Sequence, residues 1–175
     1  MLFSHGLLWD TRLVAPQVAE LRGHHRCIAW DHRGQGRSEV TADGYDMDTV
    51  AADAAALIER LGVAAVHFVG LSMGGFVGLR LAIRRPELLR SPVLIDISAT
   101  PESPDHRPRY RLLNLVTRWF GLRPAAGRVT RILCGWTFVA DPARATERAE
   151  WRARLLALDR TGTPRAVWPS NTPTA

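Results

Sequence analysis

Cysteine is scarce in this sequence, and no stretch of it is apolar for long. The two cysteines, Cys27 and Cys134, show neither metal-site spacing nor the density of a disulfide scaffold, so we interpret both as small buried thiols. No apolar run approaches the roughly 20 residues of a membrane span, and the N-terminus lacks a signal-peptide pattern. We therefore predict a cytoplasmic protein with no membrane partner, no metal and no cofactor.

Lysine is absent, so all 23 basic residues are arginine. Residues 1–105 hold 10 arginines against 13 acidic residues, whereas residues 106–175 hold 13 arginines against 4. A basic segment can bind nucleic acid, but no recognition motif or row of aromatic residues accompanies this one. We expect the arginines to line solvent-exposed helix faces and predict no nucleic-acid partner; attraction of anionic substrates stays open.

Short apolar runs and helical patterns alternate through the first hundred residues. The runs are almost wholly hydrophobic, as strands buried on both faces are. Their alternation with helices predicts an α/β fold with a parallel sheet of about four strands. The predicted strands are residues 1–4, 26–30, 66–69 and 92–98. The predicted helices are residues 10–22, a helix that is capped by Asp46 or Asp48 and ends at 61, and residues 73–85.

A proline-rich stretch from residue 100 to residue 106 marks a boundary in the chain. Beyond it the pattern predicts arginine-rich helices with no strand between them, which would lie as a lid over the sheet's active edge. The last residues are rich in proline and threonine and predict no structure. The predicted organisation is a core at 1–100, a helical lid at 101–161 and a disordered or aberrant tail at 162–175.

The sequence from Gly70 to Gly74 reads Gly-Leu-Ser-Met-Gly and lies between a predicted strand and a predicted helix. This Gly-x-Ser-x-Gly pattern is typical of a tight turn that lifts a nucleophilic serine, here Ser72, clear of the backbone. The glycines are expected because side chains two residues either side of the serine would collide with the neighbouring strand and helix. The alternative is a glycine-rich turn with an idle serine.

Two backbone amides are candidate oxyanion donors. Met73 starts the helix after Ser72, and Leu7 follows a His-Gly pair at the end of the first strand. Because catalytic loops of open α/β sheets lie at the carboxyl ends of strands, both fall on the expected edge. Asp31 and Arg33, after the second strand, could also be catalytic, but we interpret them as an ion pair that stabilises a turn.

These motifs together resemble the α/β-hydrolase superfamily, in its lid-bearing group of esterases, enol-lactonases and cofactor-free haloperoxidases. The resemblance implies Ser72 as nucleophile, the amides of Leu7 and Met73 as oxyanion hole, and cleavage of small-molecule esters, thioesters or lactones through an acyl-enzyme. It covers residues 1 to about 100 well and residues to about 165 loosely. The matching segments are Phe3–Gly6, Asp31–Ser38, Gly70–Gly75 and Leu94–Asp96.

The sequence departs from this family after the serine. There the acid and histidine follow the nucleophile on later strands, which are not predicted here. The only histidine after Ser72 is His106, and Asp96 is the well-placed strand-end acid, so a triad would need both partners on one loop. We expect a chain truncated at both ends, with impaired catalysis and with exposed sheet edges that favour self-association. The alternative function is a non-catalytic remnant that binds a small molecule or a partner.

Overall fold

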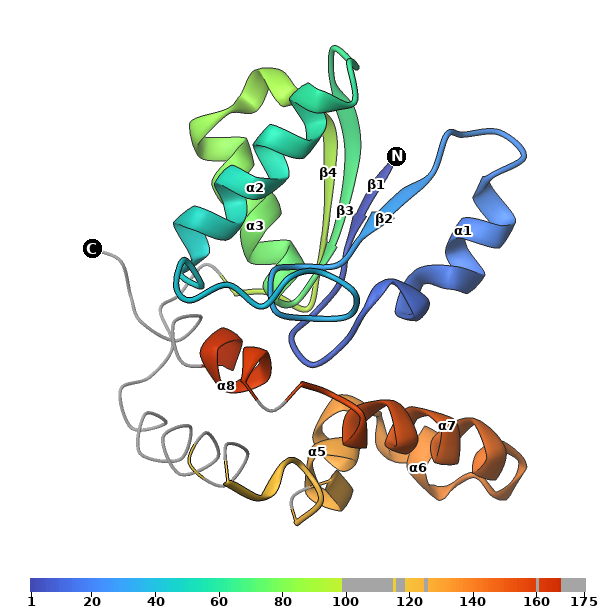
Figure 1. The fold of residues 1–175 in the computed structure, drawn as a ribbon. Helices are drawn as coiled ribbons and strands as arrows, with labels where there is room; N and C mark the ends of the chain where they lie inside the picture. The colour runs from blue at the N-terminus through green and yellow to red at the C-terminus, as the bar shows by residue number, and fades with distance from the viewer. Residues whose placement is uncertain (99–114, 116–118, 125, 160, 168–175) are drawn as a thin grey trace.

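Four parallel strands form the centre of the structure, in the order β2-β1-β3-β4 (Figure 1). This confirms the predicted sheet, with the second and fourth strands of the chain at its two ends. In the register, Phe3 of β1 lies between Ala29 and Val69. The strands are β1 Leu2–Ser4, β2 Ile28–Trp30, β3 Val66–Leu71 and β4 Leu89–Ile95.

The computed structural model describes residues 1–98, 115, 119–124, 126–159 and 161–167. Helices α2 and α3 pack together on one face of the sheet, and α1 lies on the other side (Figure 1). The helices are η1 Thr11–Val14, α1 Ala15–Leu21, α2 Met47–Arg60, α3 Met73–Arg84, η2 Pro86–Leu88, α5 Ala126–Leu133, α6 Trp136–Ala140, η4 Pro142–Arg144, α7 Ala145–Leu156 and α8 Gly162–Val167.

The main hydrophobic core lies between the sheet and helices α2 and α3. Phe68 at the centre of β3 is fully buried, and burying a side chain of this size stabilises the fold by about 2 to 3 kcal/mol. Gly78 of α3 lies against the Phe68 ring at a point where a Cβ would come within 2.8 Å of it. The helix can therefore approach β3 closely, which fixes the position of its first residues at the end of that strand.

Helix α2 is capped by Asp46, one of the two caps that the sequence allows. The Asp46 carboxylate accepts from the Thr49 N–H at 2.9 Å and from its hydroxyl at 2.6 Å. These bonds satisfy a helix amide that would otherwise lack a partner, and they hold the pKa of Asp46 below its usual value. The helix then buries one stripe of small and aliphatic residues, namely Met47, Val50, Ala51, Ala54, Ala55 and Ile58.

The C-terminal helices form a second, smaller cluster of buried residues. It is built on Leu8 from the loop after β1 together with Leu122, Val129 and Leu155. Trp9 adds an edge-to-face contact with Trp151 of α7, at 4.6 Å between ring centroids. The first loop of the chain and the α5–α7 segment are therefore in direct contact.

Residues 162–167 form helix α8, where the sequence predicts an unstructured tail. Contacts with the 34–41 loop explain the difference. Gly162 lies directly against the Gly34 carbonyl, and Arg165 donates to Thr41 O at 2.6 Å. Thr163 is 2% exposed. Such tertiary contacts stabilise a short helix that local propensity does not predict. Residues 168–175 of the predicted tail lie outside the described part of the chain, as do residues 101–114, 116–118, 125 and 160 of the predicted lid.

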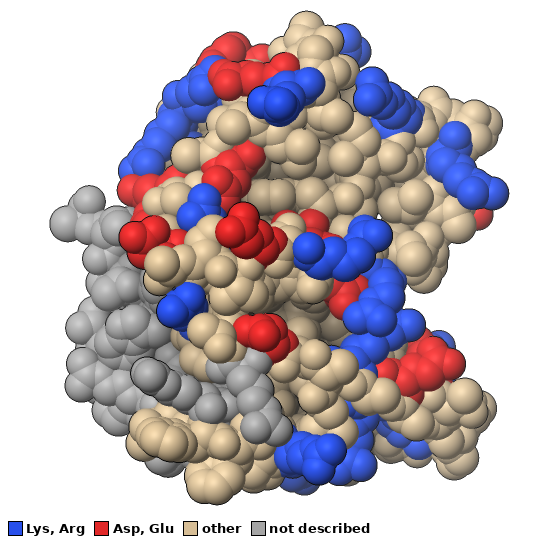
Figure 2. Space-filling view, viewed as in Figure 1, with Lys and Arg blue, Asp and Glu red and all other residues tan. Residues whose placement is uncertain are grey.

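Acidic and basic side chains are interspersed over the upper half of the face in Figure 2. Several arginines of the first hundred residues pair with carboxylates on helix surfaces. Arg80 and Arg84 contact Asp48 at 2.9 and 2.8 Å, and Arg85 contacts Glu59 at 2.6 Å. No helix in the described part of the chain is long and apolar enough to span a bilayer.

Candidate active site

Ser72 lies at a sharp turn between β3 and α3, with φ 50° and ψ −113°. A positive φ favours glycine, and holding a serine there costs about 1 to 3 kcal/mol. Two backbone hydrogen bonds hold the turn: Ser72 N–H donates to Ile95 O at 2.8 Å, and Gly74 N–H donates to His5 O at 3.1 Å. Among the described residues the Ser72 side chain has no hydrogen-bond partner, and it is partly exposed. The turn therefore presents a free hydroxyl at the carboxyl edge of the sheet.

Close backbone contacts require the glycines around Ser72. A Cβ on Gly70 would overlap the Gly74 carbonyl in the first turn of α3, and a Cβ on Gly74 would overlap the Ser4 carbonyl at the end of β1. A Cβ on Gly75 would overlap the Ile97 side chain in the same way. The predicted reason for these glycines, collision with the neighbouring strand and helix, is confirmed.

The two candidate oxyanion donors lie on different segments near Ser72. Met73 is the first residue of α3, so its N–H belongs to the turn whose amides have no intrahelical acceptor. A Cβ on Gly6 would come within 3.4 Å of Ser72 Cβ, so the loop that carries Leu7 passes beside Ser72. The Leu7 side chain is partly buried and packs against both hydrophobic clusters. Their role as an oxyanion hole stays a prediction.

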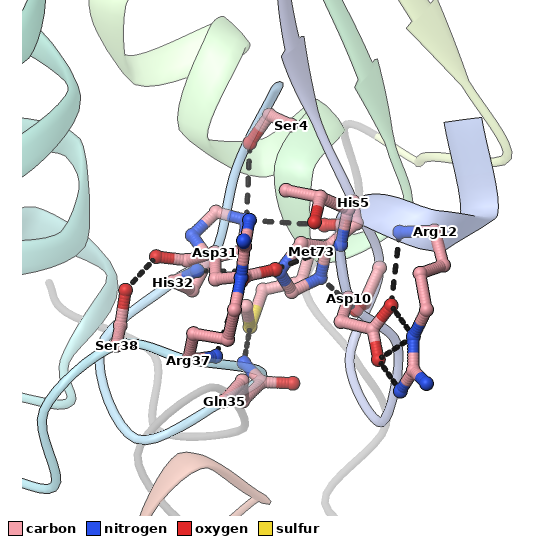
Figure 3. A network of polar contacts seen from close by, with 12 residues as sticks. Ser4, His5, Asp10, Arg12, Asp31, His32, Gln35, Arg37, Ser38 and Met73 are labelled. Atoms are coloured by element: carbon pink, nitrogen blue, oxygen red, sulfur yellow. Dashed lines mark hydrogen bonds and ion pairs between the residues drawn. The ribbon is translucent and has the colours of Figure 1, made fainter. Parts of the chain in front are cut away.

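A buried polar network joins the loop after β1 to the loop after β2 (Figure 3). His5 and His32 are 1% and 0% exposed, and their rings meet edge to face at 4.5 Å. His32 N–H donates to His5 Nε2 at 3.2 Å, and His5 Nδ1–H donates to Gly6 O at 2.7 Å. His5 is therefore neutral with its proton on Nδ1. Sequence reasoning missed this network, because nothing in the local pattern pairs residues 27 positions apart.

Ser4 and His32 form a serine–histidine pair that cannot act as nucleophile and base. His32 Nε2 lies 3.0 Å from Ser4 Oγ and 3.1 Å from His5 O. A carbonyl oxygen only accepts hydrogen bonds, so Nε2 carries the proton and cannot take one from Ser4. Ser4 is also 1% exposed, out of reach of a substrate. The pair stabilises the two loops and is not a second candidate for the reactive serine.

The sequence matches a family described as alpha/beta hydrolase fold over residues 1–160, which is most of the chain. The chain belongs to the α/β-hydrolase fold family. Solved structures agree. The enol-lactonase from Burkholderia xenovorans LB400 superposes with a TM-score of 0.85 at 27% identity, over 97% of this chain and 64% of that one. A thermophilic esterase from Thermogutta terrifontis gives 0.85 at 29% identity, over 97% and 62%.

Curated relatives match between half and three fifths of this chain. The RutD protein of Pseudomonas savastanoi pv. phaseolicola, provisionally named a carbamate hydrolase, is 39% identical over 103 residues. The match covers 58% of this chain and 39% of that protein. The BpoC protein of Mycobacterium tuberculosis, provisionally named a non-heme bromoperoxidase, is 46% identical over 90 residues, which is 51% of this chain and 33% of that protein. The matches thus span about a third to two fifths of these relatives.

The predicted ion pair between Asp31 and Arg33 does not form in the turn after β2. Arg33 instead binds Asp53 of α2 through two contacts of 2.6 Å. The buried Asp31 carboxylate accepts from the backbone N–H groups of Thr11 and Arg37 at 2.7 and 3.1 Å. The predicted pairing is therefore wrong in its partners. Asp31 serves as a buried acceptor for two loops, because both amides are turned inward at this edge of the sheet.

Asp96 follows β4 directly and has φ 54° and an exposed side chain. The hydrogen bond from Ser72 to Ile95 places it next to the turn that carries Ser72. His106, the other partner of the triad considered from sequence, lies outside the described residues. Within the described ranges no group of three or more His, Cys, Asp or Glu side chains could hold a metal ion. That the protein needs no metal or cofactor stays a prediction.

Acidification is expected to destabilise this fold through the buried histidines. Burial lowers the pKa of His5, and burial together with the nearby His5 lowers the pKa of His32 well below the usual 6.5. The unfolded chain therefore binds more protons, and stability is complete above pH 6.5 and falls as the pH drops below it. One histidine that stays neutral contributes a loss of about 1 to 2 kcal/mol between pH 7 and pH 5.

Urea unfolding followed by circular dichroism at several pH values measures this loss. His32→Gln should flatten the pH dependence, whereas His24→Gln, at an exposed site, should leave it unchanged. Equal slopes in the wild type and His32→Gln between pH 7 and pH 5 would contradict the assignment.

Proposed function

We propose that this α/β hydrolase cleaves carboxylic ester, thioester or lactone bonds of small molecules through an acyl-enzyme on Ser72. The main support is the Ser72 hydroxyl, which is free and partly exposed in a strained turn. It lies at the N-terminus of α3, where the helix dipole favours negative charge, and beside the loop that carries Leu7. A nucleophile with oxyanion donors from two segments is the arrangement that acyl transfer needs.

The proposed reaction has two steps. Ser72 Oγ bonds to the carbonyl carbon while its proton passes to a base, and the amides of Leu7 and Met73 stabilise the negative oxygen that develops. The carbon–oxygen or carbon–sulfur bond to the leaving group then breaks, and the alcohol or thiol departs with a proton. Water next attacks the acyl-enzyme and releases the carboxylic acid and the free serine.

The names of the related proteins agree with this reaction class. An enol-lactonase and an esterase act on an acyl carbon bonded to oxygen, and a carbamate hydrolase acts on an acyl carbon bonded to oxygen and nitrogen. All three reactions require attack at a carbonyl and stabilisation of an oxyanion. We infer the reaction class alone, since the names of these relatives specify different substrates.

The proton acceptor decides between this function and its alternative. No described residue hydrogen bonds to Ser72 Oγ, and a serine without a base is a weak nucleophile. The second candidate function is therefore a non-catalytic protein that keeps the site and binds a small molecule or partner. The test supplies imidazole as the base and asks whether an activated ester acylates Ser72 in the wild type and not in Ser72→Ala. Acylation supports the hydrolase, and ligand binding without acylation supports the alternative.

Self-association through the sheet edge is part of this proposal. Strand β4 ends the described sheet, and its Val93 and Ile95 side chains are 47% and 45% exposed. An exposed apolar strand at a sheet edge favours pairing with another chain. We expect sedimentation velocity to show concentration-dependent dimers or larger species, and Val93→Lys to reduce them. A monomer at all concentrations would contradict this expectation.

A further inference from the structure

The Gln35 side chain connects the loop after β1 to the turn that carries Ser72. It is 4% exposed and lies in the loop after β2, where Gln35 N–H donates to His32 O at 2.9 Å. Its Oε1 accepts from the Leu8 N–H at 2.9 Å. Its Nε2 lies 3.9 Å from Met73 Sδ (Figure 3). One amide group therefore touches both segments that supply the candidate oxyanion donors.

Leu8 occupies a strained position that needs support. The Trp9 N–H donates to Gly6 O at 3.3 Å, which closes a four-residue turn with Leu8 in its third place. Leu8 has φ 67°, a conformation that such turns normally give to glycine or asparagine. Its side chain is buried in the cluster with Val129 and Leu155 of the C-terminal helices. A leucine held at this φ costs about 1 to 2 kcal/mol.

The hydrogen bond to Gln35 is strong enough to offset this strain. A buried N–H left without an acceptor costs about 1 to 3 kcal/mol, so the turn would relax if Gln35 could not accept from Leu8. Leu7 is the preceding residue of the same turn. Relaxation of Leu8 would therefore reorient the peptide group that carries the Leu7 N–H. The Leu7 N–H belongs to the peptide whose carbonyl is Gly6 O, which accepts from His5 Nδ1–H at 2.7 Å and from Trp9 N–H at 3.3 Å. His5 holds this peptide from one side, and the turn that Gln35 supports holds it from the other.

We propose that Gln35 is a positioning residue, which holds Leu8 in its left-handed conformation and so keeps the Leu7 amide directed at the oxyanion site. This inference rests on the proposed function of Ser72. Gln35 does not touch the reacting atoms, and its effect passes through Leu8. The C-terminal helices support the same turn through the Leu8 side chain, so lid packing and oxyanion binding share one residue.

The test compares an oxygen ester with its thionoester, in which sulfur replaces the carbonyl oxygen. Sulfur accepts hydrogen bonds poorly, so an oxyanion donor accelerates the oxygen ester more than the thionoester. The ratio of the oxygen-ester acylation rate to the thionoester acylation rate therefore reports on oxyanion donors. The ratio does not change with the fraction of folded protein, since unfolding lowers both rates equally. With p-nitrophenyl acetate, its thionoester and imidazole, we expect Gln35→Leu to lower the ratio roughly tenfold.

Three further variants make the result decisive. Gln35→Glu keeps an acceptor for Leu8 and should restore most of the ratio, whereas Gln35→Met, a second non-acceptor, should lower it as Gln35→Leu does. Gln17→Leu changes an exposed glutamine of α1 and should leave the ratio at the wild-type value. An unchanged ratio in Gln35→Leu or Gln35→Met would overturn the role of Gln35. Acylation that persists in Ser72→Ala would instead overturn the proposed function.

Discussion

Ser72→Ala is expected to abolish acyl transfer from p-nitrophenyl acetate in the presence of imidazole. The substitution removes the oxygen that forms the acyl bond and leaves the backbone amides in place. The rate above that of imidazole alone should therefore fall roughly a hundredfold or more. Release of p-nitrophenolate measures the rate, and mass spectrometry of the peptide that spans β3 and α3 locates the acyl group.

Ser91→Ala is the matched control for this experiment. Ser91 lies on β4 opposite His67 near the start of β3, and its hydroxyl lies 2.8 Å from His67 Nδ1. It is thus a serine on the same sheet at the end away from Ser72, and its loss should leave the rate unchanged. An acyl group found on another residue, or a Ser72→Ala protein as fast as the wild type, would rule out the proposed nucleophile.

Gly74→Ala is expected to cause the largest loss of stability of any single methyl addition near the site. The new Cβ would overlap the Ser4 carbonyl and come within 2.8 Å of the His5 carbonyl. Ser4 is the last residue of β1 and His5 follows it directly, so relief requires β1 and α3 to separate. The separation would also break the Gly74–His5 hydrogen bond. We expect a cost of about 3 kcal/mol or more, a large part of the stability of a typical domain.

Gly127→Ala is the control for this substitution, since Gly127 lies in α5 with nothing within 4 Å of its added Cβ. There alanine should be neutral or stabilise the helix by about 0.5 to 1 kcal/mol. Urea unfolding followed by circular dichroism compares the two variants. Equal unfolding midpoints for Gly74→Ala and the wild type would show that β1 does not press against α3 as described.

Features that depend on neighbouring residues could be predicted well from the sequence. The turn at Ser72 is one, because its glycines lie within two positions of the serine and a strand and a helix flank it directly. The start of α2 is another, since the two candidate caps, Asp46 and Asp48, lie two positions apart and the partner Thr49 is three residues from Asp46. The parallel sheet followed from short apolar runs separated by helices, because strands of that kind must be buried on both faces.

Features that depend on distant residues were missed or assigned to wrong partners. The contact between Arg33 and Asp53 spans 20 positions, and the contact between Leu8 and Gln35 spans 27. Helix α8 was missed for the same reason, because its support comes from the loop around Gly34 and Thr41. Charge and polarity in a sequence indicate that such groups need partners, but many partners satisfy the same local pattern.

The amino-acid sequence was sufficient to predict the fold family, the candidate nucleophile and the edge of the sheet where chemistry would occur. The nucleophile candidate and the edge follow from turn sterics and hydrophobic periodicity, which act over a few positions, whereas the family follows from the resemblance of the motifs to known proteins. Only the three-dimensional arrangement decided which buried groups pair. It shows that Ser4 and His32 hydrogen bond to each other without forming a reactive pair, and that Gln35 accepts a hydrogen bond from Leu8. Such pairings are set by how the strands and helices close on one another, because a buried donor bonds to whichever acceptor the packing brings within about 3 Å.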